Sequence, residues 1–171
     1  MRPTGIHERA VIGSPPEHRE WQVGDKFFQP EIDPTARVNA YVTIDAGLKA
    51  PTRVGARSFI MAGCHIGHDA QVGEDCELAP KTVLGGHAQL GNKVRCGVGV
   101  LVKPFVKIGD GARLGMGAVV NKDVPAGEIW VGNPAEEISR MKKRRHFMVE
   151  LEEFQLEWME RDRQAEEEKR H

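Results

Sequence analysis

The chain has 171 residues, of which 24 are Lys or Arg and 25 are Asp or Glu, so its formal net charge is only −1. This balance gives no electrostatic reason to expect nucleic acid or an anionic membrane as a partner. No apolar run is long enough to span a membrane, and the N-terminus lacks the apolar core of a signal peptide. The three cysteines are odd in number. We therefore expect a cytoplasmic protein.

A six-residue spacing of aliphatic residues begins near the N-terminus and is interrupted twice. Ile6 and Ile12 form the first pair, and the polar stretch 14–29 then breaks the pattern. We expect this stretch to be a loop inserted at a corner of a regular scaffold, where an insertion leaves the core undisturbed. The spacing resumes at Ile32, and a shorter interruption covers residues 50–53.

From Val54 to Pro125 the pattern continues without a slip through twelve consecutive hexapeptides. The first position of each is aliphatic or, once, cysteine: Val54, Ile60, Ile66, Val72, Leu78, Leu84, Leu90, Cys96, Val102, Ile108, Leu114 and Val120. The fifth position is small or β-branched throughout, and the second is most often glycine. Cys64, Cys76 and Cys96 all fall on first or fifth positions, so we expect them in the core as reduced thiols.

A six-residue period predicts a parallel β-helix. Three hexapeptides close one triangular coil, so residues 18 apart should stack at the strand spacing of about 4.8 Å. The first and fifth positions should point inward and pack on their equivalents in the next coil, and the glycines should permit the sharp turns between strands. A β-sandwich, the all-β alternative, would instead show alternation of period two and irregularly spaced turns.

The composition changes after Ala135 to charged helix formers. Five apolar residues recur there at helical spacing: Met141, Met148, Leu151, Phe154 and Trp158. They predict an amphipathic helix whose apolar face packs on its own domain or on a sister subunit. We therefore expect a β-helix over residues 1–135, with the inserted loop 14–29, and a C-terminal helix and tail over residues 136–171.

Three histidines and an aspartate gather on one edge of the expected prism. His68 and Gly86 are one full coil apart in the numbering, and so are Asp69 and His87. Each pair should therefore stack on adjacent coils, with His65 nearby. An imidazole can accept a proton near neutral pH, a carboxylate can fix its tautomer, and a glycine N–H can bind an oxyanion.

A simpler interpretation treats these residues as solvated turn positions, and for one histidine alone it would be preferred. The cluster favours a functional site. We expect no metal there, because no cysteine faces outward and the histidines lack the helical spacing of a two-histidine zinc motif.

The stretches His65-Ile66-Gly67-His68-Asp69 and Gly86-His87 resemble, at the same spacing, the UDP-N-acetylglucosamine O-acyltransferases that start lipid A synthesis. The closing Gly132-Asn133-Pro134-Ala135 is similar to hexapeptide acetyltransferases more broadly, including sialic-acid and amino-sugar acetyltransferases. The resemblance covers roughly residues 6–135 and implies a left-handed parallel β-helix that assembles as a homotrimer. The expected fold class is therefore an all-β, left-handed parallel β-helix with a C-terminal α-helix.

The resemblance also implies roles for individual residues. His68 matches the general base, Asp69 its carboxylate partner and Gly86 the oxyanion donor. His65 and His87 match substrate contacts. No acyl-enzyme is expected, because the cysteines point inward.

The implied donor is an acyl thioester on a phosphopantetheine arm, carried by coenzyme A or an acyl carrier protein, with no permanently bound cofactor. We expect the arm to pass Gly97, Lys103 and Gly115. The sequence departs from the family where its His-Gln-Phe string becomes Lys103-Pro104-Phe105.

The implied acceptor is a hydroxyl or amine of a nucleotide-linked sugar. The inserted loop also differs from the family, and we expect Glu17, His18 and Arg19 on it to contact the acceptor. An alternative is that the loop packs its aromatic residues on a neighbour and touches no ligand. Acyl length, the carrier, the sugar and the choice between O- and N-acylation stay open.

Two other functions fit the same fold. A γ-carbonic-anhydrase-like enzyme would need a second histidine five residues after another, and no such pair exists in the repeat, so its zinc triad is incomplete. A non-catalytic trimeric scaffold would tolerate the loss of His68 and Asp69, yet both are present. We therefore expect an acyltransferase.

Overall fold

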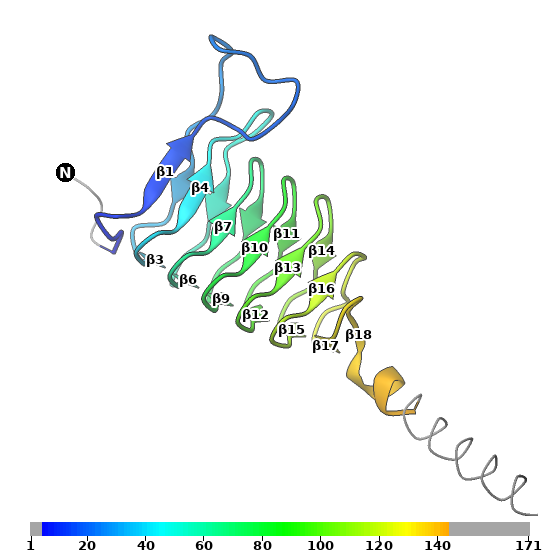
Figure 1. Cartoon of the computed structure of the whole chain (residues 1–171). Coiled ribbons are helices and arrows are strands. Elements are labelled where there is room, and N and C mark those ends of the chain that lie inside the picture. The colour runs from blue at the N-terminus through cyan, green and yellow to red at the C-terminus, as the bar shows by residue number, and fades with distance from the viewer. Residues whose placement is uncertain (1–4, 144–171) are drawn as a thin grey trace, which may run out of the picture. The chain divides into compact units, whose positions relative to one another are not determined.

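The computed structural model describes residues 5–143, in which short strands form three parallel sheets that wrap into a β-helix (Figure 1). The first sheet contains β1 (Val11–Ser14), β4 (Thr43–Asp45), β7 (His65–Ile66), β10 (Val83–Leu84), β13 (Leu101–Val102) and β16 (Val119–Val120). The second contains β2 (Glu31–Ile32), β5 (Arg53–Val54), β8 (Gln71–Val72), β11 (Gln89–Leu90) and β14 (Lys107–Ile108). The third contains β3 (Arg37–Val38), β6 (Phe59–Ile60), β9 (Glu77–Leu78), β12 (Arg95–Cys96), β15 (Arg113–Leu114), β17 (Ile129–Val131) and β18 (Glu136–Glu137). The predicted parallel β-helix is confirmed.

The register follows the predicted stack. His65 pairs with Val83, and 83 − 65 is 18. Where the pattern is interrupted the offset grows: Thr43 pairs with His65, and 65 − 43 is 22, because the short insertion lies between these coils. Val11 pairs with Thr43, and 43 − 11 is 32, because the long loop lies between them.

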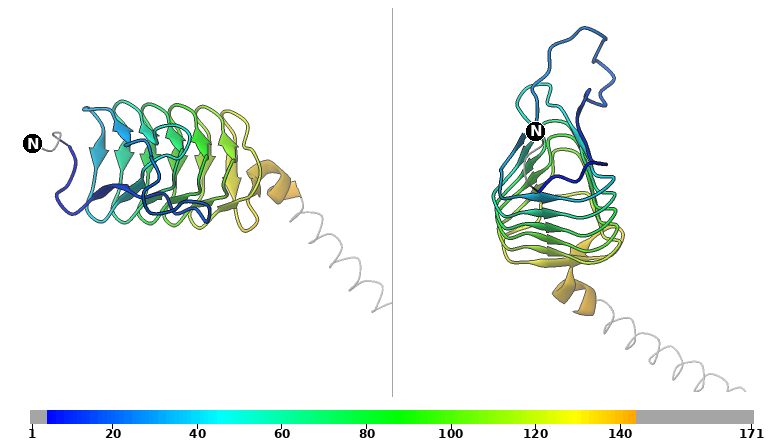
Figure 2. Two further views of the ribbon diagram at one scale, coloured as in Figure 1. Left: turned by 90° about the horizontal axis from the view of Figure 1, so that it is seen from above. Right: turned by 90° about the vertical axis from the view of Figure 1, so that its left-hand side faces the viewer.

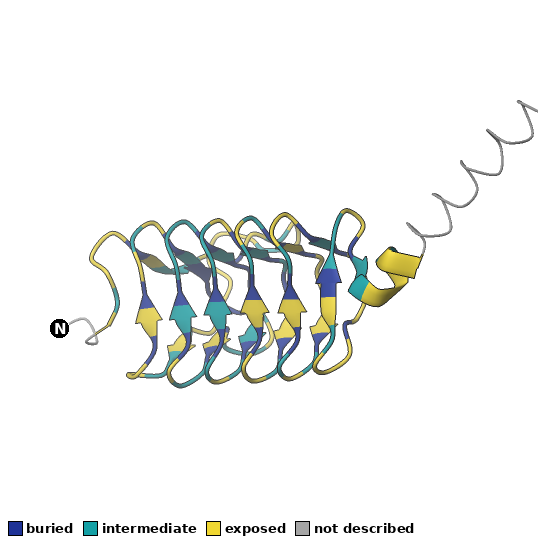
Figure 3. Cartoon of the chain, turned by 90° about the horizontal axis from the view of Figure 1, so that it is seen from below, coloured by how far each residue is buried: buried dark blue, intermediate teal, exposed yellow. Residues whose placement is uncertain are grey.

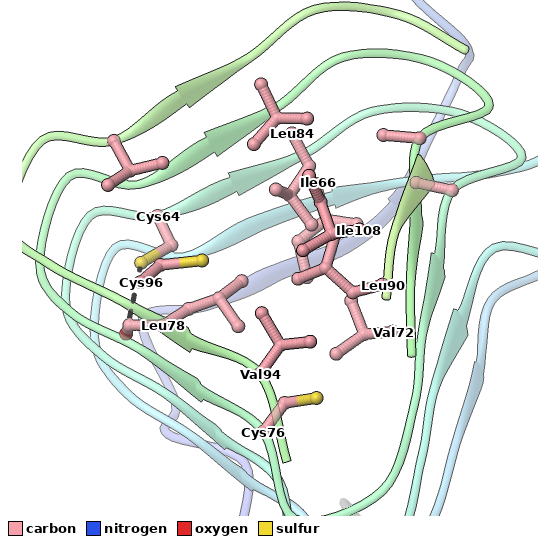
Figure 4. Close-up of a cluster of buried hydrophobic side chains, with 14 of the residues drawn as sticks. Cys64, Ile66, Val72, Cys76, Leu78, Leu84, Leu90, Val94, Cys96 and Ile108 are labelled. Atoms are coloured by element: carbon pink, nitrogen blue, oxygen red, sulfur yellow. Dashed lines mark hydrogen bonds between the residues drawn. The ribbon is translucent and has the colours of Figure 1, made fainter. Parts of the chain in front are cut away.

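The core consists of the two inward positions of each hexapeptide (Figure 4). From Val54 to Val124 every first and fifth position is buried, whereas the strand residues between them are exposed or half-buried (Figure 3). Burial of each large aliphatic side chain contributes on the order of 1.5–3 kcal/mol. The three cysteines are buried in this core as free thiols, and burial raises the pKa of each thiol.

The second-position glycines have a different role from the one expected. Their φ angles are not in the left-handed region, which is instead adopted by fourth-position residues such as Asp69 and His87, both at 60°. A Cβ on Gly67 would lie 2.8 Å from the Gly86 nitrogen, and one on Gly97 would lie 2.7 Å from the Met116 nitrogen. These glycines therefore let adjacent coils approach closely, and the prediction that they supply the turns is wrong.

Both insertions leave the same corner of the prism. Residues 15–30 connect β1 to β2, residues 46–52 connect β4 to β5, and each connection runs from the first sheet to the second. The longer loop projects from this corner in Figure 2. The two insertions pair through Phe28 and Gly47, whose backbone N–H groups each donate to the other's carbonyl at 2.8 Å. We use the name histidine corner for this edge. It comprises the two insertions and the turns 67–70, 85–88 and 103–106 of the following coils.

The first unit ends at Glu136, and in the described part of the second unit, which begins at Glu137, residues 138–143 are helical. Strand β18 thus begins directly after the expected end of the β-helix at Ala135. Met148, Leu151, Phe154 and Trp158, which carry most of the predicted apolar face, lie outside the described residues. None of the helical structure within residues 5–143 has the length and hydropathy that a membrane crossing requires.

Candidate active site

Four aromatic rings follow one another down the histidine corner. The rings of His18 and His68 meet edge to face with centroids 5.3 Å apart, and those of His68 and His87 do so at 5.1 Å. His87 then stacks on Phe105 at 4.6 Å. A cavity of about 320 Å³ opens beside these rings. Its lining comprises Glu17, His18, Asp45, His65, Gly67, His68, Gly86, His87, Pro104 and Phe105.

The Asp69 carboxylate organises this corner. Backbone N–H groups of the short insertion donate to it from Leu48 at 3.0 Å, Lys49 at 2.7 Å and Ala50 at 2.8 Å. The same carboxylate is 2.8 Å from Nδ1 of His68. Three main-chain donors and one imidazole therefore surround a carboxylate whose side chain is 3% exposed. Sequence reasoning missed these donors, because they are backbone groups that any residue carries.

The charge state of Asp69 fixes the tautomer of His68. Burial opposes ionisation, but the hydrogen bonds from His68 and from the backbone of the insertion outweigh it and lower the pKa of Asp69 to about 2. The carboxylate is thus ionised at neutral pH and can only accept hydrogen bonds. Nδ1 of neutral His68 must carry the proton, and Nε2 keeps its lone pair.

Gly86 lies directly against Nε2 of His68. A Cβ at this position would be 2.5 Å from Nε2, so any other residue would displace the imidazole. The Gly86 carbonyl accepts from the Phe105 N–H at 3.1 Å, whereas the Gly86 N–H donates to no group among residues 5–143. An unshared N–H next to a basic nitrogen is suited to bind an oxyanion.

A second carboxylate and histidine pair faces the same cavity. Nδ1 of His65 is 2.8 Å from Oγ1 of Thr43, and Nε2 is 3.8 Å from Oδ2 of Asp45. Asp45 is 2% exposed, and its Oδ2 has no hydrogen-bond partner among the described residues. Sequence reasoning missed Asp45 as well. The register would have revealed it, because Asp45 stacks with Gly67 at a hexapeptide position that is usually glycine.

The pKa values of Asp45 and His87 shift in opposite directions. Burial raises the pKa of Asp45, and His65 opposes this. The charge of Glu17 also raises the pKa, whereas a hydrogen bond between the Glu17 backbone and the Asp45 carboxyl lowers it. Burial lowers the pKa of His87 despite the opposing effect of Asp69, so His87 is neutral at pH 7. A neutral His87 can act as a hydrogen-bonding contact.

His68 and Asp69 lie outside the prism core, yet both are buried. Taken as whole residues, His68 is 8% exposed and Asp69 is 5% exposed. The insertions cover this corner, and the interpretation of His68 and Asp69 as solvated turn positions is therefore wrong. Removal of either side chain will affect stability as well as activity.

The structure brings only some of the expected ligand contacts together. Glu17 and His18 line the cavity, whereas Arg19 is exposed and does not. Lys103 precedes the lining residues Pro104 and Phe105 at the histidine corner. Gly97 follows β12 and Gly115 follows β15, so both lie where the third sheet turns into the first. Within one chain, Gly97 and Gly115 therefore do not line the cavity, and their part in the path of the donor arm stays a prediction.

Potential metal ligands gather at the histidine corner. One ligand atom from each of His68, Asp69 and His87 lies within 4.8 Å of the others. The Asp69 carboxylate, however, already accepts the backbone and His68 hydrogen bonds described above. A cation would thus have to displace the contact that sets the His68 tautomer, and the absence of a metal stays a prediction.

Residues 51–86, which include both His68 and Gly86, match the family model for the bacterial transferase hexapeptide (six repeats). Over this segment the chain resembles that family. The matched segment begins in the insertion whose backbone binds Asp69, and it ends at Gly86, the candidate donor to an oxyanion.

Curated relatives of this protein are named as acyltransferases. It is 43% identical over 99 residues to a UDP-3-O-acylglucosamine N-acyltransferase from Maricaulis maris, an alignment that covers 58% of this chain and 29% of the relative. It is 42% identical over 98 residues to an acyl-(acyl-carrier-protein)–UDP-N-acetylglucosamine O-acyltransferase from Pseudomonas putida, covering 56% of this chain and 38% of the relative. The alignments thus span less than half the length of these relatives.

Solved structures agree with the fold. The UDP-N-acetylglucosamine O-acyltransferase from Moraxella catarrhalis superposes with a TM-score of 0.74 at 33% identity, over 77% of this chain and 52% of that chain. A histidine mutant of perosamine N-acetyltransferase from Caulobacter crescentus, in complex with CoA and GDP-perosamine, gives 0.64 at 28% identity, over 77% and 54%. Both O- and N-acyltransferases therefore share this fold.

Proposed function

We propose that this protein transfers an acyl group from a phosphopantetheine thioester, on coenzyme A or an acyl carrier protein, to a hydroxyl or amine of a nucleotide-linked sugar. The observation that carries the proposal is the His68 imidazole, held by ionised Asp69 at 2.8 Å with its basic Nε2 beside Gly86. The names of the related proteins support the substrate classes.

The proposed reaction is direct transfer. The acceptor group attacks the thioester carbonyl while Nε2 of His68 takes the proton that the acceptor loses. Asp69 keeps the imidazole in the required tautomer and stabilises the imidazolium that forms. The Gly86 N–H binds the oxyanion of the tetrahedral intermediate.

The intermediate then collapses, the carbon–sulfur bond breaks, and His68 returns its proton to the leaving thiolate. The enzyme is restored without a covalent intermediate. The buried cysteines, whose pKa values are raised by burial, are poor nucleophiles and support direct attack.

The donor arm is proposed to reach the cavity along the histidine corner. Lys103 lies on the coil after His87, where its ammonium can meet a donor phosphate. Glu17 and His18 line the opposite side, where the inserted loop can contact the sugar.

A homotrimer is part of the proposal. Outward-facing Leu101 on the first sheet is 44% exposed, and Val98 and Met116 at the adjacent corner are 45% and 78% exposed. This apolar strip suits a subunit interface, and it continues toward the cavity through Phe105. Light scattering that finds an active monomer at assay concentration would contradict this assembly.

The test is a transfer assay with the purified protein. Acetyl-CoA, longer acyl-CoAs and acyl carrier protein thioesters are each combined with a panel of nucleotide sugars, and free thiol release and the acylated sugar are both measured. We expect free thiol and acylated sugar in equal amounts for at least one combination of donor and acceptor. A thioester that is only hydrolysed, or no turnover with any pair, would contradict it.

A further inference from the structure

Asp45 stands apart from the groups that the proposed mechanism uses. Its Oδ2 has no hydrogen-bond partner among the described residues, although the side chain is only 3% exposed and lines the cavity. A buried acceptor without a partner is costly, so its presence calls for a ligand that donates to it. Nε2 of His65 lies 3.8 Å from this oxygen, beyond hydrogen-bond distance.

The charge of the cavity favours a cation there. Its lining holds two carboxylates, Asp45 and Glu17, but contains neither Lys nor Arg. The two aspartates differ, because hydrogen bonds lower the pKa of Asp69 whereas burial raises the pKa of Asp45 above its usual value.

The register of β4 and β7 places Asp45 at the cavity. Ile44 pairs with Ile66, so Asp45 stacks with Gly67, and its carboxylate lines the same cavity as His68. The cavity thus presents two proton acceptors, Asp45 and His68, to one reacting group.

We infer that Asp45 binds an ammonium group of the acceptor sugar and thereby selects an amino sugar, so that the protein is an N-acyltransferase. The inference rests on the proposed function and chooses between its two acceptor classes. The related proteins do not make this choice, because both N- and O-acyltransferases are among them.

The proton balance of the reaction agrees with two acceptors. A hydroxyl gives up one proton during acyl transfer, whereas an ammonium must give up two. The first passes from the bound ammonium to Asp45 and on to solvent, which frees the nitrogen lone pair for attack on the carbonyl. The second passes from the tetrahedral intermediate to Nε2 of His68 and then to the leaving thiolate. The products are an amide, a thiol and one released proton.

The test uses matched acceptors that differ only in the reacting group. The full-length protein and a thioester donor are combined with GDP-perosamine or GDP-rhamnose, and with UDP-N-acetylglucosamine or its 3-amino-3-deoxy analogue. We expect kcat/KM to be higher for the amine of the productive pair by about 10- to 100-fold, the range for a charge-assisted hydrogen bond. Asp45→Asn should remove most of this preference, and Asp45→Glu should keep part of it.

Stability separates a binding role from a structural one. Asp45→Asn removes a buried charge without a hydrogen-bond partner at Oδ2, so its melting temperature should equal or exceed that of the wild type. Asp75 provides the matched control, because its carboxylate pairs with Arg57 and lies outside the cavity. Asp75→Asn should leave the amine preference unchanged.

The outcomes separate amine selection from acyl transfer itself. Transfer to the hydroxyl member with equal or greater kcat/KM overturns the amine selection but leaves acyl transfer intact. Amine selection by Asp45 is also overturned, with acyl transfer intact, if Asp45→Asn keeps the amine preference or if this variant is strongly destabilised. Absence of transfer to every acceptor overturns the proposed function and the inference with it.

Discussion

Replacing Asp69 with asparagine tests whether the histidine corner is held together as the structure indicates. The variant keeps the size of the side chain and tolerates the left-handed φ of 60° at this position, but it removes the charge. It also puts an NH2 group where one oxygen now accepts from a backbone N–H or from His68. Stability should therefore fall in a pH-dependent manner.

The magnitude follows from the pKa. A carboxyl whose pKa falls from 3.8 unfolded to about 2 folded contributes about 2.5 kcal/mol to the free energy of unfolding at pH 7. Because the folded-state pKa is the lower one, this contribution is complete above pH 3.8 and is lost as the pH falls through 2. At pH 3 about half of it remains. The melting temperature of Asp69→Asn at pH 7 should be lower by about 5–10 °C.

The assay is thermal and urea unfolding of both proteins at pH 7 and pH 3, followed by circular dichroism. Asp75→Asn is the control, because Asp75 has the same hexapeptide position and a φ of 55° but takes part in an exposed ion pair with Arg57. Its effect should stay below about 1 kcal/mol. Equal stability of Asp69→Asn and wild type at pH 7, or a difference that does not shrink at pH 3, would refute the reasoning.

Three further predictions concern the cavity. His87→Ala should raise KM for the acceptor more than it lowers kcat, because neutral His87 is a contact and not the base, and the opposite pattern would reassign it. Prolonged EDTA treatment should leave turnover unchanged, since His68 and Asp69 are engaged with each other, and loss of activity restored by zinc would contradict this. Deletion of residues 15–20 should change the acceptor preference in the nucleotide-sugar panel, because it removes Glu17 and His18 from the cavity, and an unchanged preference would limit the loop to a structural role.

The repeat predicted the scaffold well because its two inward positions are physical requirements of every coil. The pairing of His65 with Val83 and the burial of all three cysteines follow directly from that spacing. The role of the glycines was misjudged, because a sequence cannot show whether a missing Cβ serves a turn or the close approach of another coil. At Gly67 and Gly97 it is the approach of the next coil.

The candidate site could be predicted where residues stack at the regular spacing of 18. The prediction failed where the insertions interrupt that spacing. The regular spacing placed His68 next to Gly86, and their contact agrees with it. The donors at Leu48, Lys49 and Ala50 are main-chain groups without a residue signature, and only folding of the insertion brings them to Asp69. The cover that they provide also explains why the corner is buried.

The most direct test of acyl transfer by general-base catalysis is the turnover number of His68→Ala with the best donor and acceptor from the panel. We predict a fall in kcat of about 10²- to 10⁴-fold. Gel filtration and melting curves should show a folded protein of unchanged assembly, somewhat less stable because one hydrogen bond to Asp69 is lost. Near-normal turnover by this variant, or an acyl-cysteine trapped in the wild type and seen by mass spectrometry, would contradict the proposed mechanism.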